Sequence, residues 1–203
     1  MVKAYVLEAP QKLSLVSLPE PQIGDDDVLV GIKSVGLCGS DVEIYQGHRP
    51  PVQTEGPARL GHEAAGVVEE VGRHVRGLRP GDPVVVRGVW GCFAERVAAS
   101  TRPATQCVSA AFHQVVKLPP DIPIEDASIL EVVPKTLKAV ARAGISPASD
   151  VLIKGQGVSG LLLTQAARLY SPNMLVVADL FDETVVQQLT AGFQGHAGLL
   201  GIG

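Results

Sequence analysis

Short runs of apolar residues, separated by glycine, proline and aspartate, dominate the chain before residue 120. Residues 28–35, 66–71 and 83–87 are three such runs, and all three are rich in valine. Runs of this length bounded by turn residues are typical of β-strands, and a succession of them favours a small barrel or sandwich. The first part of the chain is therefore expected to be a β-domain.

The spacing of apolar positions changes beyond residue 120. Val133, Leu137 and Val140 recur at the spacing of one helical face. Two short apolar runs, residues 150–154 and 174–178, then flank a glycine-containing loop and an apolar helical segment. A strand, a helix and a second strand at this spacing predict one βαβ unit with parallel strands.

These patterns predict two domains, a β-rich domain over residues 1–132 and an α/β domain over residues 133–203. A doubly wound sheet has about five or six strands, whereas residues 150–203 contain two strand patterns. The last twelve residues, 192–203, are too rich in glycine to favour a helix or a strand. The second domain is therefore expected to be partial.

The composition is that of a folded, turn-rich protein. Of the 203 residues, 46% are hydrophobic, and 22 glycines and 15 prolines supply turns. The formal net charge is -4, with 17 Lys and Arg against 21 Asp and Glu. Because no basic stripe is present, a nucleic-acid partner is not expected.

The chain also lacks the sequence signals of export and membrane insertion. Glu8 and Pro10 interrupt the first apolar run too early for a signal peptide. No apolar stretch approaches the roughly 18–20 residues of a membrane-spanning helix. Three cysteines, an odd and sparse set, argue against a secreted disulfide framework. A cytoplasmic protein without membrane partners is expected.

A glycine-rich segment follows the run at residues 150–154. Gly155, Gly157 and Gly160 form a G-x-G-x-x-G pattern between the expected strand and helix, and Asp179 ends the next strand nineteen residues later. Such a loop places backbone N–H groups and a positive helix end against a pyrophosphate, while the aspartate accepts from a ribose hydroxyl. The pattern predicts a dinucleotide site that favours NAD over NADP. A structural turn that binds nothing is the alternative.

A second group of residues has the chemistry of a metal site. Cys38, His62 and Glu63 offer a thiolate, an imidazole and a carboxylate, which suit zinc better than calcium or magnesium. A lone cysteine or histidine is more often a packing residue. From the residues alone both interpretations stay open.

Several motifs together resemble the zinc-dependent medium-chain alcohol and polyol dehydrogenase family. They occur in the family's order and extend from residue 1 to about residue 190: residues 36–41, 61–66 with Gly72 and Val75, 80–82, 93–95 and the glycine loop. The resemblance implies a GroES-like β-barrel followed by the start of a Rossmann-type domain.

The resemblance also implies roles for individual residues. Cys38 and His62 would be ligands of one catalytic zinc ion, and Glu131 the third ligand of polyol and threonine dehydrogenase-like members. Glu63 would be the carboxylate beside the metal, which leaves the choice between the two glutamates open. Ser40 would pass the proton of the reacting alcohol towards solvent. The lobe that holds a second, structural zinc is missing, so Cys92 and Cys107 are expected to be buried thiols.

The activity that the resemblance implies is hydride transfer between a secondary alcohol or polyol and NAD, with zinc polarising the alcohol oxygen. Two alternatives belong to other classes. One is a non-catalytic zinc-binding relative that associates with a partner chain, which the partial second domain favours. The other is a zinc-free quinone or enoyl reductase, although such relatives lack the cysteine and histidine ligands. A homo- or hetero-oligomer is compatible with each of these.

Overall fold

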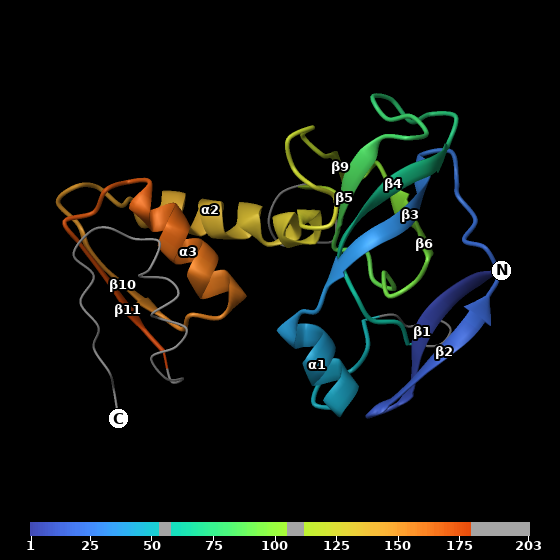
Figure 1. Ribbon diagram of the computed structural model, residues 1–203, viewed down its shortest axis with the longest axis horizontal. Coiled ribbons are helices and arrows are strands. Elements are labelled where there is room, and N and C mark those ends of the chain that lie inside the picture. The colour runs from blue at the N-terminus through green and yellow to red at the C-terminus, as the bar shows by residue number, and fades with distance from the viewer. Residues whose placement is uncertain (53–57, 105–111, 180–203) are drawn as a thin grey trace. The chain divides into compact units, whose positions relative to one another are not determined.

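The computed structural model describes residues 1–52, 58–104 and 112–179. The chain divides into two compact units, Met1–Glu131 and Val132–Gly203. The first unit is built mainly from strands, and the second combines helices with a small sheet (Figure 1). The mixed fold class expected from the sequence is confirmed.

A five-stranded antiparallel sheet forms the centre of the first unit. Its spatial order is β6-β3-β4-β5-β9. The strands are β3 (Asp27–Gly36), β4 (Glu63–Val71), β5 (Pro83–Arg87), β6 (Arg96–Ser100) and β9 (Val115–Lys117). Val28 and Val30 on β3, and Val84 and Val86 on β5, are fully buried and belong to one core cluster. Their spacing of two residues places them on one face of the sheet, as the alternation along a strand requires.

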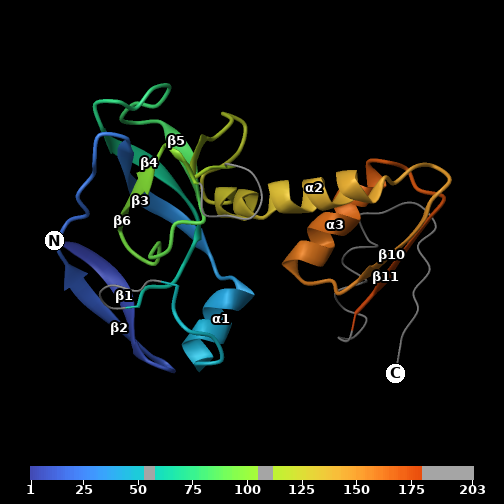
Figure 2. The same ribbon diagram turned by 180° about the vertical axis from the view of Figure 1, so that it is seen from behind.

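A hairpin lies beside this sheet in both views of the molecule (Figures 1 and 2). It consists of β1 (Val2–Ala9) and β2 (Lys12–Leu18), which pair antiparallel. Backbone contacts tie β1 to distant segments, since the Tyr5 N–H donates to the Phe93 carbonyl at 2.8 Å and Leu7 bridges to Ala58. A second, very short pair is formed by β7 (Pro103–Ala104) and β8 (Phe112–His113).

Two short helical segments in the first unit were not expected from the sequence. Helix α1 (Gly39–Gln46) follows β3, and the 3-10 helix η1 (Ala127–Glu131) ends the unit. In α1 the buried residues are Asp41 and Ile44, so its sequence offers almost no apolar periodicity to recognise. In η1, Ala127 packs with buried residues of the sheet.

The second unit contains the βαβ arrangement that the sequence predicts. Strand β10 (Asp150–Lys154), helix α3 (Val158–Arg168) and strand β11 (Met174–Ala178) follow one another, and the two strands pair in parallel. Helix α2 (Val133–Ala143) precedes them. Val140 of α2 packs in one cluster with Ala166 and Ala167 of α3. The glycine-rich residues 192–203 lie outside the described part of the chain.

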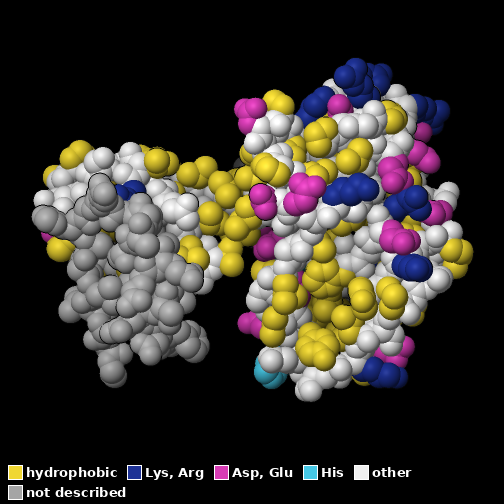
Figure 3. Space-filling view, viewed as in Figure 1, with side chains coloured by type: hydrophobic (Ala, Val, Ile, Leu, Met, Phe, Trp, Pro, Cys, Tyr) yellow, Lys and Arg dark blue, Asp and Glu magenta, His cyan; other side chains and the backbone are white. Residues whose placement is uncertain are grey.

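Positive and negative side chains are interspersed on the face of the first unit that Figure 3 shows. Lys and Arg gather at the upper end, where the loop between β4 and β5 carries exposed Arg73, Arg76 and Arg79. Arg73 is paired there with Asp25 at 2.5 Å. Among the described residues, no helix is long and apolar enough to cross a membrane.

Candidate functional site

The pairing of β3 with β4 brings the three candidate zinc-binding side chains together. Gly36, the last residue of β3, lies opposite Glu63, the first residue of β4. Cys38 and His62 are close to this pair in the chain and therefore close in space. Cys38, His62 and Glu63 each offer one ligand atom, and these atoms lie within 4.8 Å of one another.

This donor set fits a zinc ion. Zinc takes cysteine sulfur, histidine nitrogen and carboxylate oxygen at about 2.0–2.3 Å, so small side-chain rotations would let all three atoms reach one ion. His62 and Glu63 are each 8% exposed, whereas Cys38 is half-buried. The cluster is therefore buried on the side of His62 and Glu63 and more accessible on the side of Cys38, as a catalytic site with an open coordination position requires.

Three neighbours hold the imidazole of His62. Trp90 stacks on its ring with centroids 4.2 Å apart, and Ser40 Oγ lies 3.5 Å from Nε2. Asp41 Oδ1 lies 3.6 Å from Nδ1, yet Nδ1 has no hydrogen-bond partner among the described residues. A buried nitrogen without a partner costs free energy, and a slightly shorter contact with Asp41 or a bound metal ion would each give this imidazole the partner it lacks.

Asp41 ties the two ligand-bearing segments together, and the sequence reasoning did not assign it a role. Its fully buried carboxylate accepts the N–H of Gly61 at 2.8 Å and the N–H of Cys38 at 3.0 Å. Burial raises its pKa, but His62 and the two N–H donors outweigh burial, so the pKa lies below its ordinary value. The three-residue spacing from Cys38 at a helix start was the available signal.

Gly61 explains the sharp turn in front of His62. Its φ of +82° belongs to the left-handed region, and a Cβ atom there would lie 2.8 Å from the Phe93 nitrogen. The Gly61 carbonyl in turn accepts the N–H groups of Gly91 and Cys92, both at 3.0 Å. These contacts hold the Trp90 segment against His62, and a side chain at position 61 would push that segment away.

Glu131 is not one of the three clustered residues. It is 3% exposed and ends η1 within the first unit. Between the two glutamates that the sequence leaves open, Glu63 is the one grouped with Cys38 and His62. A ligand role for Glu131 stays a prediction.

Cys92 has the properties of a packing thiol. It is fully buried, its Sγ lies 3.1 Å from the Val89 carbonyl, and burial raises its pKa to about 12. A thiol with so high a pKa is a poor source of thiolate. Cys107 lies outside the described residues.

The second unit brings the predicted dinucleotide-binding residues together. Gly155 follows β10 with a φ of +89°, and Gly157 is the N-cap of α3. A Cβ atom on Gly160 would lie 1.8 Å from the Gly155 carbonyl oxygen, so only glycine allows the helix to start this close to the strand. Asp179 accepts a hydrogen bond from the Gln156 N–H. The carboxylate therefore lies at the loop whose N–H groups would face a pyrophosphate.

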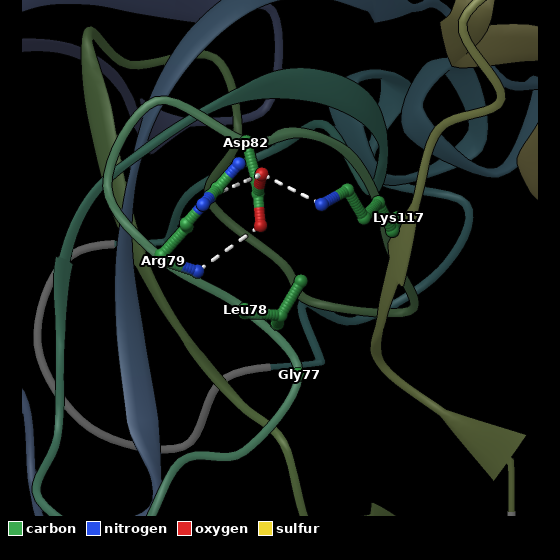
Figure 4. Close-up of a pocket in the computed structure, with 5 residues that line it drawn as sticks. All are labelled: Gly77, Leu78, Arg79, Asp82 and Lys117. Carbon is green, nitrogen blue, oxygen red and sulfur yellow. Dashed lines mark hydrogen bonds and ion pairs between the residues drawn. The ribbon is translucent and has the colours of Figure 1, made fainter.

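A separate cavity of about 370 Å³ lies beside the β4–β5 loop and is lined by Gly77, Leu78, Arg79, Asp82 and Lys117 (Figure 4). None of the predicted site residues lines it. Buried Asp82 accepts hydrogen bonds from the Lys117 ammonium at 2.7 Å and from the Arg79 backbone N–H at 3.1 Å, and the Arg79 guanidinium lies 3.7 Å from the same carboxylate. Because both cations already have this carboxylate as a partner, the cavity marks a structural ion cluster that fastens the loop to β9.

This ion cluster predicts a pH dependence of stability. The hydrogen bond from Lys117 lowers the pKa of Asp82 and outweighs the effect of burial. A carboxyl group with a lowered folded-state pKa stabilises the fold above its unfolded pKa, about 4, and the stabilisation is lost as the pH falls through the folded value. Asp82→Asn should therefore lower the melting temperature near neutral pH but hardly at all in strong acid. Equal losses at every pH would contradict this.

Comparison with known proteins finds a family model and relatives that are dehydrogenases or reductases. Residues 24–121 match the model of the alcohol dehydrogenase GroES-like domain. Sorbitol dehydrogenase of Bacillus subtilis (strain 168) is 31% identical over 197 residues, which cover 88% of this chain and 56% of that protein. D-xylulose reductase of Morganella morganii is 30% identical, with 97% of this chain and 63% of that protein covered.

A solved structure of another dehydrogenase has a similar fold. Galactitol-1-phosphate dehydrogenase from Escherichia coli superposes with a TM-score of 0.76 and 25% identity, covering 93% of this chain and 58% of that chain. The chain thus spans 56–63% of the length of the two curated relatives named above.

Proposed function

The chain belongs to the zinc-type medium-chain alcohol and polyol dehydrogenase family, and on this premise we propose that it serves hydride transfer between a secondary alcohol or polyol and NAD. The observation that carries the proposal is the grouping of Cys38, His62 and Glu63 within 4.8 Å. The names of the relatives support the substrate class, since sorbitol is a polyol and D-xylulose is the ketone of one. The free thiols of Cys38 and Cys92 support a reducing compartment, the cytoplasm.

Cys38, His62 and Glu63 would hold one zinc ion. Bound zinc supplies a Lewis acid that lowers the pKa of an alcohol oxygen. Asp41 keeps the two ligand-bearing backbones in place, and Trp90 fixes the plane of the His62 ring. Glu131 is the alternative carboxylate ligand and would have to approach the cluster.

Ser40 is placed to move a proton. Its half-buried hydroxyl lies 3.5 Å from His62 Nε2, and a hydroxyl can accept one proton while donating another. It would accept the proton of the substrate alcohol and release its own towards solvent. NAD supplies the hydride acceptor, and Gly155, Gly157, Gly160 and Asp179 would hold its adenosine and pyrophosphate.

The test is a paired measurement on the purified, zinc-loaded chain. Metal analysis after dialysis should find one zinc ion per chain, and sorbitol or xylitol should drive NADH formation. One bound zinc without turnover on any of a panel of polyols would instead favour the non-catalytic zinc-binding alternative. Turnover without zinc would favour the zinc-free reductase alternative.

Asp179 makes the proposed preference for NAD testable. Its carboxylate would accept from a ribose 2′-hydroxyl but repel a 2′-phosphate. We expect the chain to bind NADH about tenfold or more tightly than NADPH, since a hydrogen bond to a charged group contributes about 1.5–3 kcal/mol and about 1.4 kcal/mol corresponds to a factor of ten.

The change Asp179→Ser should bring the two dissociation constants close together in calorimetric titrations. Asp150→Ser is a suitable control, because Asp150 lies at the opposite end of the β10–β11 pair and should leave the ratio unchanged. Tighter binding of NADPH by the unmodified chain would refute the assignment.

A further inference from the structure

The second residue of the glycine loop turns its side chain inward. Gln156 is 2% exposed and ranks among the largest fully buried side chains of the described residues. Its amide nitrogen lies 3.1 Å from the Gly155 carbonyl and 3.4 Å from the Ile153 carbonyl of β10. Burial of an amide is costly unless its polar atoms are paired, so this side chain has a defined structural task.

Thr164, one of the buried residues of α3, completes the pairing of this amide. Its hydroxyl oxygen lies 3.1 Å from Gln156 Oε1 and 2.9 Å from the Gly160 carbonyl. Both N–H groups of the amide face backbone carbonyls, so Oε1 must face the hydroxyl. The orientation of the glutamine side chain is thereby fixed from strand, loop and helix.

The backbone of Gln156 reaches the fourth element of the unit. Its N–H donates to the Asp179 carboxylate, directly after β11. One residue thus connects the end of β10, the glycine loop, the first turns of α3 and the candidate ribose-binding aspartate. None of these contacts needs a bound ligand.

We propose that the buried Gln156–Thr164 pair is the positioning device of the dinucleotide loop. The buried side chains of Gln156 and Thr164 would fix the loop from the interior of the unit. The loop would then hold the N–H groups at the start of α3 in the orientation that receives a pyrophosphate, with Asp179 beside them. The inference rests on the proposed NAD function and adds two positioning residues to it. Both side chains are buried, at 2% and 5% exposed, so their effect on a cofactor would pass through the loop backbone.

Removal of the threonine hydroxyl isolates the effect. In Thr164→Val the shape is retained, but the single hydroxyl proton that lies within reach of both Gln156 Oε1 and the Gly160 carbonyl is removed from a buried place. The amide must then rotate or seek water, and the loop moves with it. Thr164→Ser keeps the hydroxyl and should restore the wild-type loop.

A matched control is available in the same unit. Thr136 of α2 is 5% exposed, and its hydroxyl donates to the Val133 carbonyl at 2.7 Å. Thr136→Val therefore removes a buried helix hydroxyl that has no contact with the loop. It should alter thermal stability about as much as Thr164→Val does, without altering cofactor affinity.

The experiment titrates NADH, ADP-ribose and adenosine into the full chain by calorimetry. Thr164→Val should weaken the binding of NADH and of ADP-ribose about tenfold, because misplaced loop N–H groups lose hydrogen bonds to the pyrophosphate. It should weaken the binding of adenosine far less, because adenosine lacks the pyrophosphate. Hydrogen exchange of the Gln156 N–H without ligand should also become faster in Thr164→Val and stay slow in Thr164→Ser and Thr136→Val.

Three results would overturn the inference. Equal NADH affinity in wild type and Thr164→Val, with unchanged exchange at Gln156, leaves the NAD proposal intact and removes the positioning role. Equal losses for all three ligands mean that the unit has unfolded rather than lost its loop orientation. A wild-type chain that binds neither NADH nor ADP-ribose refutes the NAD proposal itself, and the inference fails with it.

Discussion

The change His62→Ala is expected to abolish zinc binding by the chain. Loss of a group that merely orients a ligand weakens metal affinity by about 10–100-fold, and loss of a ligand costs more. Of the three grouped ligand atoms only Cys38 Sγ and a Glu63 oxygen remain, and both are needed beside the imidazole for a catalytic zinc site with three protein ligands. Any zinc-dependent turnover should fall to background with the metal.

The single tryptophan of the chain offers a direct readout. Trp90 stacks on His62, so zinc addition should change its fluorescence in the wild type and leave it unchanged in His62→Ala. His74→Ala is the matched control, because His74 is an exposed histidine near Asp26. Zinc retained at one equivalent per chain by His62→Ala would contradict the assignment.

The change Asp41→Asn is expected to damage both stability and zinc affinity. The carboxylate accepts two backbone N–H groups in a fully buried place. In an amide of the same shape, the oxygen can accept from only one of these N–H groups, and the NH2 group then faces the other, which loses its acceptor. We expect the free energy of unfolding to fall by about 2–4 kcal/mol and the zinc affinity to fall by about 10–100-fold.

Denaturant titration and a competitive zinc assay measure the two effects of Asp41→Asn. Asp27→Asn is the control, since Asp27 also accepts a backbone N–H, from Gly24 at 2.9 Å, but in an exposed place. Its effect should stay within about 1 kcal/mol. If Asp41→Asn lowered stability without changing zinc affinity, the proposed link between Asp41 and the Cys38–His62–Glu63 group would be wrong.

The larger elements of the fold could be predicted from the sequence because their signals are local. The valine-rich runs became β3, β4 and β5, and the strand–helix–strand pattern became β10, α3 and β11. Helix α1 could not be predicted, because its buried residues are one aspartate and one isoleucine. Hydrophobic periodicity carries no information where a buried position is polar.

The candidate site shows the same division. Cys38, His62 and Glu63 carry ligand atoms, so their residue types and motif spacing pointed to them. Asp41 contacts Gly61, and Trp90 contacts His62, across 20 or more positions, and single-sequence reasoning cannot pair residues so far apart; only the contact of Asp41 with Cys38 is local enough to leave a sequence signal. Gln156 is an unmarked position of the glycine pattern, and only the structure reveals that it faces inward.

X-ray absorption at the zinc edge of the zinc-loaded chain tests the central claim most directly. The account predicts one zinc per chain with one sulfur neighbour at about 2.3 Å and two or three nitrogen or oxygen neighbours at about 2.0–2.2 Å. Cys38→Ser should remove the sulfur signal. Zinc lost on dialysis, or bound without any sulfur neighbour, would contradict the account.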